Sequence, residues 1–434
     1  MIPIYRWKET AQEIKDRIMA RSNQDVDAFL PQAQKIIDEV KNRGDQAIID
    51  YTREFDGADL SQAGLQVSEE EIEQASARLD PKVKEAIDVS YQNILTFHER
   101  QMPEEIWMTE VGPGLVCGEK ISPIESCVLY VPRGTAAYPS VMLMLGVPAK
   151  VAGVRRIAVA TPPQPDGTVD DATLYAARII GIDEIYRFGG VQAVAAFALG
   201  TPTVKPALKI VGPSNIYATA AKKILYGKID VGVPAGPSES IILADQSADP
   251  ELVATDVLIE AEHGPYSAAL VVTHHEPLAN AVAELIPAKV KALPQKQQDY
   301  ITRVFSNYGG IALTGSLQES ISLVNDYAPE HLEVLTEEPL ALLPKLENAG
   351  EIMMGKYTPI SLCNYSLGVN AILPTGGRAK SASVVTVHDF LKKTSVSYAT
   401  QEGYDRLRPY VADFADFEGF PAHAAAVRID RSKK

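Results

Sequence analysis

The sequence has few cysteines and no long uncharged apolar segment. Cys117, Cys127 and Cys363 are scattered and form neither a CxxC pair nor a disulfide framework, so we expect them to be reduced, as in the cytosol. No stretch approaches the roughly 18 apolar residues of a membrane span. The charged N-terminal segment lacks the apolar run of a secretory signal. The sequence therefore predicts a soluble, cytoplasmic protein.

Basic residues are outnumbered as well. Lys and Arg number 41 against 56 Asp and Glu, which gives a formal net charge of −15. Because nucleic-acid binding needs a basic surface, this balance argues against a nucleic-acid partner. A hydrophobic content of 46% with 22% charged residues is typical of a globular protein. The 434 residues exceed one ordinary core, which predicts two or three domains.

The first hundred residues show helical periodicity. Ile36, Ile37 and Val40 recur at the spacing of one helix face. Ser68, followed three residues later by Glu71, predicts a capping box at the start of another helix. We interpret these apolar stripes as packing surfaces.

From about residue 125, short apolar runs alternate with helical segments. This alternation predicts right-handed βαβ units and parallel sheets covered on both faces. The expected strands are 127–131, 156–160, 184–188, 207–211, 240–245, 268–272 and 310–314. The expected helices are 171–180, 191–199, 278–293 and 398–411. We predict two doubly wound lobes, with a smaller helical tail beyond residue 386.

Ligands of a doubly wound sheet bind beyond the carboxyl ends of its strands. The segments expected there are rich in Gly, Ser, Thr or Asn, whose backbone N–H groups could contact a ligand. They are 132–139, 189–193, 212–217 and 235–239. The sequence contains no GxGxxG fingerprint and no P-loop, so these residues alone leave dinucleotide binding and ordinary turn chemistry as open alternatives.

The histidines are few enough to consider one by one. Four lie in charged or loop-like surroundings and are interpreted as solvated: His98, His274, His275 and His388. His263 follows Glu260 by three residues, near the end of a helix expected to begin near Pro250, so both side chains leave the same face. Glu-x-x-His is an effective pair of metal ligands, although the spacing is also common by chance.

Glu330 and His331 supply two titratable groups that can exchange protons with a substrate near neutral pH. Adjacent residues on a helix do not face one another, so we expect two separate proton transfers. The alternative is a surface glutamate beside a helix-capping histidine. His423 lies close to the end of the chain, where a lone histidine is usually inert unless the tail covers a site.

Many colinear segments resemble the histidinol dehydrogenase family over nearly the whole chain. They are YVPRGTAAYPS (130–140), VAGV (151–154), FGGVQAVAAFALGT (188–201), KIVGPSNIYATAAKK (209–223), AGPSES (235–240), AEHGP (261–265), YAPEHLE (327–333), LPTGG (373–377) and HDFLKKTSV (388–396).

The resemblance implies an intertwined homodimer with two doubly wound, incomplete Rossmann-like domains. We expect the following division of the chain: a helical arm at 1–25, a first domain from 26–129 and 240–384, an NAD-side domain at 130–239, and a dimerisation tail at 385–434.

The resemblance also implies a chemistry, the oxidation of an alcohol through an aldehyde to a carboxylate with reduction of two NAD. The implied NAD contacts are Tyr130, Gln192 and Asn215. The implied Zn²⁺ ligands are Glu260, His263, Asn364 and His423, the last reaching across from the partner subunit. His331 would accept the hydroxyl proton and Glu330 would activate water. The implied substrate contacts are Ser238 and Glu418.

The metal ligands depart from the family pattern, which has Gln at position 260 and Asp at position 364. Glu260 and Asn364 together still supply one carboxylate and one amide. We interpret this exchange as a compensated swap that preserves a zinc site.

The substrate positions depart further. Ile360 and Ala371 stand where the family has a Glu and a His that help to receive the amino-imidazole end of histidinol, and a site without its polar partners loses discrimination. Arg133 and Arg378 replace Gly and Thr; each is either an exposed side chain or a contact for an anionic substrate. The segment 132–140 does not resemble the subgroup that acts on a sulfonated diol.

We therefore predict a zinc-dependent, NAD-linked dehydrogenase of a small polar alcohol other than histidinol. A genuine L-histidinol dehydrogenase is the first alternative. A catalytically silent binding homologue is the second, and the retention of Glu330, His331 and the metal-ligating histidines argues against it.

Overall fold

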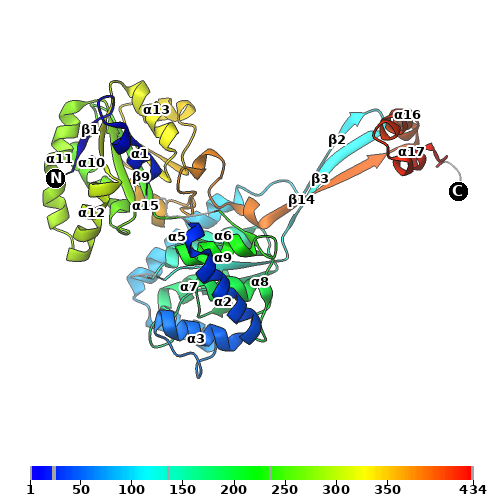
Figure 1. The fold of residues 1–434 in the computed structure, drawn as a ribbon, viewed down its shortest axis with the longest axis horizontal. Coiled ribbons are helices and arrows are strands. Elements are labelled where there is room, and N and C mark those ends of the chain that lie inside the picture. The colour runs from blue at the N-terminus through cyan, green and yellow to red at the C-terminus, as the bar shows by residue number, and fades with distance from the viewer. Residues whose placement is uncertain (1, 22–25, 134–136, 234–235, 432–434) are drawn as a thin grey trace.

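The protein consists of two α/β lobes and a thin arm that projects away from them (Figure 1). The computed structural model describes residues 2–21, 26–133, 137–233 and 236–431. Two separate parallel sheets confirm the predicted fold class. Within the described residues, no helix is long and apolar enough to cross a membrane.

The first lobe contains a wholly parallel sheet with helices on both faces (Figure 1). Its strands, in spatial order, are β1 (Ile4–Arg6), β11 (Gly310–Leu313), β10 (Ala268–Thr273), β9 (Glu239–Ala244), β12 (His331–Leu335) and β13 (Glu351–Met354). Its helices include α1 (Gln12–Ala20), α10 (Pro250–Ala261), α11 (Glu276–Lys291), α12 (Gln295–Asn307), α13 (Leu317–Tyr327), α14 (Pro339–Leu342) and α15 (Ile360–Tyr365). Every residue of β9 and β10 is buried, which explains their nearly continuous apolar sequences.

The second lobe contains another parallel sheet. Its strands, in spatial order, are β6 (Glu184–Tyr186), β5 (Arg156–Ala160), β4 (Ser126–Tyr130), β7 (Lys209–Val211) and β8 (Asp230–Val231). Its helices are α2 (Leu30–Arg43), α3 (Asp45–Asp56), α4 (Glu69–Arg78), α5 (Pro81–Glu99), α6 (Pro139–Val151), α7 (Asp171–Ile180), α8 (Gly190–Leu199) and α9 (Ile216–Leu225). Ser68 and Glu71 form the predicted capping box at the start of α4.

The assignment of residues 26–129 to the first domain is wrong. Ile36 and Ile48, from α2 and α3, share a core with Val128 of β4. Ile94 of α5 packs in the other core of the same lobe. The helices therefore cover the second sheet, because their apolar stripes meet its two faces. The N-terminal segment 1–25, which was predicted to be helical, is not purely helical either, since β1 pairs with β11.

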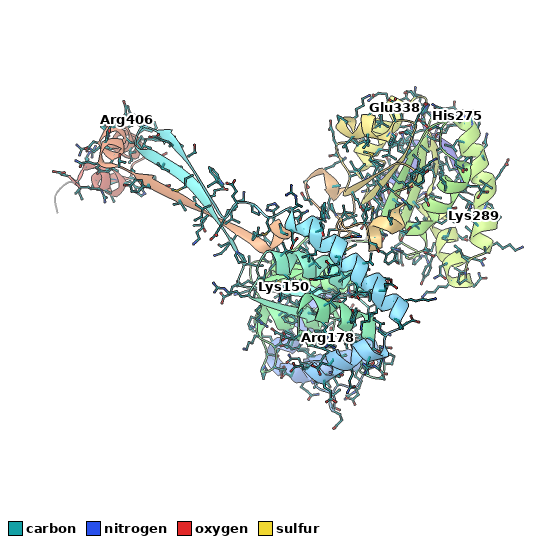
Figure 2. The ribbon with its side chains drawn as sticks, turned by 180° about the vertical axis from the view of Figure 1, so that it is seen from behind. Lys150, Arg178, His275, Lys289, Glu338 and Arg406 are labelled. Carbon is teal, nitrogen blue, oxygen red and sulfur yellow. The ribbon has the colours of Figure 1, made fainter. Side chains whose placement is uncertain are left out.

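The projecting arm is a three-stranded antiparallel sheet that ends in two helices (Figure 1). It contains β2 (Ile106–Gly112), β3 (Leu115–Pro123), β14 (Leu391–Ala399), α16 (Gln401–Phe417) and α17 (Pro421–Arg428). The predicted tail lacked a strand. Most residues of β14 are exposed, so its sequence carries no apolar alternation that would indicate a strand. Arg406 of α16 lies far from both lobes (Figure 2).

Candidate active site

A cavity of about 410 Å³ lies between the two lobes. The second lobe contributes residues beyond the carboxyl ends of its strands, since Pro132 follows β4 and Pro213 follows β7. The first lobe contributes the amino ends of its strands, since Ser238 precedes β9 and His331 begins β12. The rule that ligands bind beyond carboxyl ends therefore locates only the second lobe's part. Residues 134–136 and 235, which belong to the predicted ligand-binding segments, lie outside the described residues.

Glu260, His263 and Asn364 meet at this cavity, as the sequence predicted. Helix α10 begins at Pro250 and ends at Ala261, so Glu260 lies in its last turn and His263 lies just beyond its end. One Glu260 oxygen, Oε2, lies 3.0 Å from His263 Nδ1. The other, Oε1, accepts a hydrogen bond of 2.9 Å from Asn364 Nδ2. Ser238 Oγ lies 3.1 Å from His263 Nδ1, so this predicted substrate contact is also at the site.

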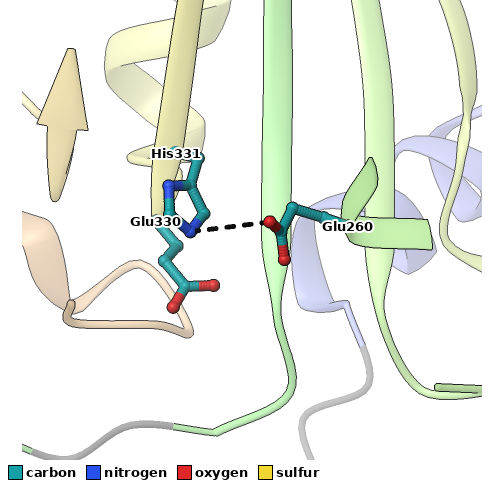
Figure 3. Close-up of side chains that lie close together, drawn as sticks. All are labelled: Glu260, Glu330 and His331. Atoms are coloured by element: carbon teal, nitrogen blue, oxygen red, sulfur yellow. Dashed lines mark ion pairs between the residues drawn. The ribbon is translucent and has the colours of Figure 1, made fainter. Parts of the chain in front are cut away.

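Glu330 and His331 lie at the amino end of β12, beside Glu260 (Figure 3). A carboxylate oxygen of Glu260, one of Glu330 and a ring nitrogen of His331 all lie within 4.8 Å of one another. Glu330 Oε2 accepts a hydrogen bond of 2.9 Å from the backbone N–H of Glu239. The expected helical placement of this pair is wrong, because His331 begins β12, which pairs in parallel with β9 and β13, and Glu330 immediately precedes that strand.

The three buried groups hold protons differently. Burial alone would raise the pKa of Glu260, but the charges of His263 and His331 lower it to about 2. Burial raises the pKa of Glu330 to about 8. Burial would lower the pKa of His331, whereas Glu260 and the other neighbouring carboxylates raise it to about 9. Glu260 is thus the fixed negative charge, whereas the pKa values of Glu330 and His331 both lie above 7.

Two predicted site residues are not at this cavity. Glu418 follows α16 and His423 lies on α17, so both stand at the tip of the arm (Figure 1). The structure therefore brings together three of the four predicted metal ligands within one chain. It also shows a grouping that the sequence did not predict, since Glu330 and His331 themselves offer ligand atoms next to Glu260.

The three predicted NAD contacts line a second cavity of about 530 Å³. Tyr130 Oη accepts a hydrogen bond of 2.8 Å from the backbone N–H of Gly190. Gln192 Oε1 is buried and has no hydrogen-bond partner among the described residues. Asn215 caps α9 by accepting a hydrogen bond from the Ala218 N–H.

Sequence reasoning missed the contribution of α2 and α3 to this second cavity. Gln32, Phe55 and Asp56 line it together with Arg133. Their only sequence signal was helical periodicity, which reports packing. Arg133 donates a hydrogen bond of 3.1 Å to the carbonyl of Pro163. Arg378 lines a third cavity of about 560 Å³, which His263 also lines, so neither arginine lines the cavity that contains Glu330 and His331.

Asp56 makes the stability depend on pH. Burial raises the pKa of Asp56 to about 6, although Arg133 opposes this. The folded state then binds this proton more tightly than the unfolded chain, so stability falls as the pH rises from about 4 to about 6 and stays lower above. We expect Asp56→Asn to raise the free energy of unfolding near pH 8, with a gain that shrinks toward pH 4. Urea unfolding of the variant and the wild type at pH 8 and at pH 4 measures this difference in the free energy of unfolding.

The matched control is Asp59→Asn. Arg53 lowers the pKa of Asp59 to about 2, so this substitution removes a favourable ion pair and brings no gain near pH 8. Equal pH dependence of the Asp56→Asn protein and the wild type would contradict the assignment to Asp56.

Of the two apolar departures, only Ala371 lines the cavity between the lobes. Ile360 is fully buried against Met353 and Cys363. The expectation that the side chain at this position contacts the substrate is therefore wrong. Helix α15 begins at Ile360 and turns this side chain into a small apolar cluster. The loss of a polar group at this position therefore changes the packing behind the site.

His98 was interpreted as solvated, and this is wrong. Its side chain is fully buried on α5. The ring Nδ1 lies 2.8 Å from the carbonyl oxygen of Ile94, and Nε2 lies 3.3 Å from Asn370 Nδ2. By contrast His275, the residue before α11, lies at the outer edge of the first lobe (Figure 2). The charged residues that follow His98 in the sequence, Glu99 and Arg100, are exposed at the end of the helix.

Fold and site together define a class: an α/β protein with a buried cluster of carboxylates and a histidine between two parallel-sheet lobes. The sequence model of histidinol dehydrogenase matches residues 19–431. The chain therefore belongs to the histidinol dehydrogenase family, which is a family of oxidoreductases.

Individual relatives agree with this assignment. A histidinol dehydrogenase of Synechocystis sp. is 48% identical over 419 residues, which are 96% of each chain. A protein of Cereibacter sphaeroides named histidinol dehydrogenase homolog is 47% identical, over 94% of this chain and 93% of its own. The crystal structure of histidinol dehydrogenase from Elizabethkingia anophelis superposes with a TM-score of 0.92 at 33% identity, covering 98% of this chain and 97% of its own.

Proposed function

We propose that this protein is a zinc-dependent, NAD-linked alcohol dehydrogenase that converts a small polar alcohol other than histidinol, through its aldehyde, to the carboxylate. The observation that carries the proposal is the buried cluster of Glu260, Glu330 and His331, in which an ionised carboxylate lies beside two proton-exchanging groups. Membership of the histidinol dehydrogenase family supports the reaction class.

The residues fit a divalent cation. Asn364 Oδ1 is buried without a hydrogen-bond partner among the described residues, and it lies beside a carboxylate and an imidazole that zinc accepts as ligands. Glu260, His263 and Asn364 would hold the ion, and His423 of the partner subunit would complete the set. When bound, zinc supplies Lewis-acid polarisation of a substrate oxygen.

The second cavity fits NAD. It contains the unpartnered amide oxygen of Gln192 together with Tyr130 and Asn215. It shares Pro132 and Tyr138 with the cavity between the lobes, so a cofactor there adjoins the proton-exchanging groups. NAD supplies the hydride acceptor, which no side chain can provide.

The reaction uses two proton acceptors, one for the alcohol and one for the water. His331 takes the hydroxyl proton while the alcohol carbon loses a hydride, and Glu330 takes a proton from the water that adds to the aldehyde. The resulting hydrate loses the second hydride. In total, one alcohol and one water yield a carboxylate, two hydrides and three protons. Ser238 and Glu418 of the partner subunit would hold the substrate.

Two observations bear on the substrate. Ala371 lines the cavity together with Met144 and Leu373. This apolar part of the wall offers no charged partner to the imidazole of histidinol, which supports an alcohol other than histidinol as the substrate. Ile360 does not line the cavity, however, so its replacement removes nothing from the wall. That finding, with the 48% identity to a histidinol dehydrogenase, makes L-histidinol the second candidate.

The deciding experiment measures NAD reduction by zinc-loaded protein with L-histidinol and with a panel of small hydroxylated or anionic alcohols. We expect turnover of one of the panel alcohols and little with L-histidinol. Ala371→His restores an imidazole to the wall, so it should raise kcat/KM for L-histidinol by about 10-fold or more. Robust wild-type turnover of L-histidinol would overturn the substrate proposal, and no turnover of any alcohol would overturn the dehydrogenase.

We also propose a homodimer in which the arms are exchanged. The arm exposes large apolar side chains on β2 and α16: Trp107, Met108, Val111, Tyr410, Phe414 and Phe417. Such a surface marks an interface. Exchange of the arms would also bring His423 and Glu418, which lie far from the cavity of their own chain, to the cavity of the partner subunit. Sedimentation analysis that finds a monomer would contradict the proposed homodimer.

The free cysteines support the proposal of a reducing, cytoplasmic location.

A further inference from the structure

Glu351 lies directly beside His331 in the sheet of the first lobe. The two residues are register partners at the amino ends of the parallel strands β12 and β13. The backbone N–H of Glu351 donates a hydrogen bond of 3.0 Å to the carbonyl oxygen of Glu330. Their side chains are only 4% and 8% exposed, so the contact between them is shielded from water.

The two nitrogens of the His331 ring have different surroundings. Nδ1 lies 3.3 Å from Glu351 Oε2. Nε2 points toward Glu260, whose Oε1 is 3.9 Å away (Figure 3). An ionised carboxylate is only an acceptor, so the nitrogen that contacts Glu351 must be the donor. In the neutral ring, the other nitrogen then has a free lone pair.

We propose that Glu351 is a positioning residue that holds the neutral His331 as its Nδ1–H tautomer and aims the Nε2 lone pair at the reacting hydroxyl. The inference rests on the proposed function in so far as His331 is the proton acceptor. It adds the residue that decides which ring nitrogen accepts the proton. With the opposite tautomer, Nε2 would carry a hydrogen and could not accept another.

The surroundings of Glu351 favour this role over a purely structural one. Glu351 forms no ion pair with a lysine or arginine among the described residues; its one ion-pair partner is His331. Its other oxygen, Oε1, is buried and has no hydrogen-bond partner in the described chain. The thiol of Cys363 also interacts with this carboxylate, but a thiol is only a weak donor. A buried carboxylate whose compensating contacts are one imidazole and one weak donor costs stability, which is expected of a group retained for its effect on a neighbouring ring.

The variants are Glu351→Gln, which keeps the size of the side chain, and Glu351→Ala, which removes every acceptor. In the active enzyme we expect kcat to fall about 10- to 100-fold, with the KM for NAD and the zinc content unchanged. The matched control is Glu333→Gln. Glu333 is equally buried two residues along β12, but its carboxyl interacts with Asp256, so kcat should remain near the wild-type value.

A readout that does not require activity is the ¹⁵N spectrum of histidine-labelled protein, recorded up to about pH 10 so that the neutral ring is observed. His331 is assigned by the signal missing from His331→Asn. We expect the wild type to keep its proton on Nδ1, and both Glu351 variants to populate the Nε2–H form.

The same single tautomer in wild type and variants would overturn the proposal, as would an unchanged kcat in an active enzyme. If no alcohol is oxidised by the wild type, the proposed function fails, while the spectrum still decides the role of Glu351.

Discussion

His331→Asn lowers kcat for NAD reduction by about 10²- to 10⁴-fold, while the KM for NAD stays near the wild-type value. The imidazole of His331 is the proposed acceptor of the hydroxyl proton, and Asn keeps a polar side chain without basicity. His331 lies in the cavity between the lobes, whereas the predicted NAD contacts line the adjoining cavity. The loss should therefore appear in catalysis and not in cofactor binding. Steady-state NADH formation at saturating alcohol measures it.

Glu330→Gln separates the two proton transfers in the same assay. Without a carboxylate to activate water, the reaction should stall at the aldehyde and yield close to one NADH per alcohol instead of two. The matched control is Glu262→Gln, an exposed acid near the site, which should retain the full yield. An undiminished rate in His331→Asn, or two NADH per alcohol in Glu330→Gln, would show that other groups accept these protons.

Glu260→Gln weakens zinc binding by about 100-fold or more, equivalent to roughly 2.7 kcal/mol. It leaves His263, His423 of the partner subunit and two amides around the ion, and a cation without a carboxylate ligand is poorly compensated. Because Asn364 Nδ2 already contacts Glu260 Oε1 at 2.9 Å, a carboxylate at either position lies close to the same point. Adding Asn364→Asp to Glu260→Gln should therefore recover most of the affinity.

The four proteins of this double-mutant cycle isolate the coupling between the two positions. Zinc affinity is measured by competition with a chromophoric chelator, and bound zinc by elemental analysis after dialysis. Asn364→Asp alone places two carboxylates in contact, which should strain the protein before the metal binds and tighten zinc binding once it is present. Additive losses in the double variant would contradict the compensated swap and would remove Asn364 from the ligand set.

Some features of the site were determined by local sequence. The Glu260-x-x-His263 spacing and the Gly264–Pro265 stop predicted that both side chains lie near one helix end, and α10 ends at Ala261 between them. The apolar runs from residue 127 onward predicted β4, β5, β6, β7, β9, β10 and β11, because a strand buried on both faces needs continuous apolar sequence. They did not predict β1, β8, β12 or β13. The capping box at Ser68 follows from side-chain reach alone.

Other features depend on which elements meet. His331 and Glu351 are 20 residues apart in sequence and become neighbours only because β12 pairs with β13. The burial of His98, the inward turn of Ile360 and the attachment of α2–α5 to the second lobe were likewise settled by tertiary contacts. Periodicity shows which face of an element is apolar, but not what covers it. The sequence thus determined the residue types and the local geometry of the proposed zinc ligands, and strand pairing decided which carboxylates surround the proton-accepting histidine.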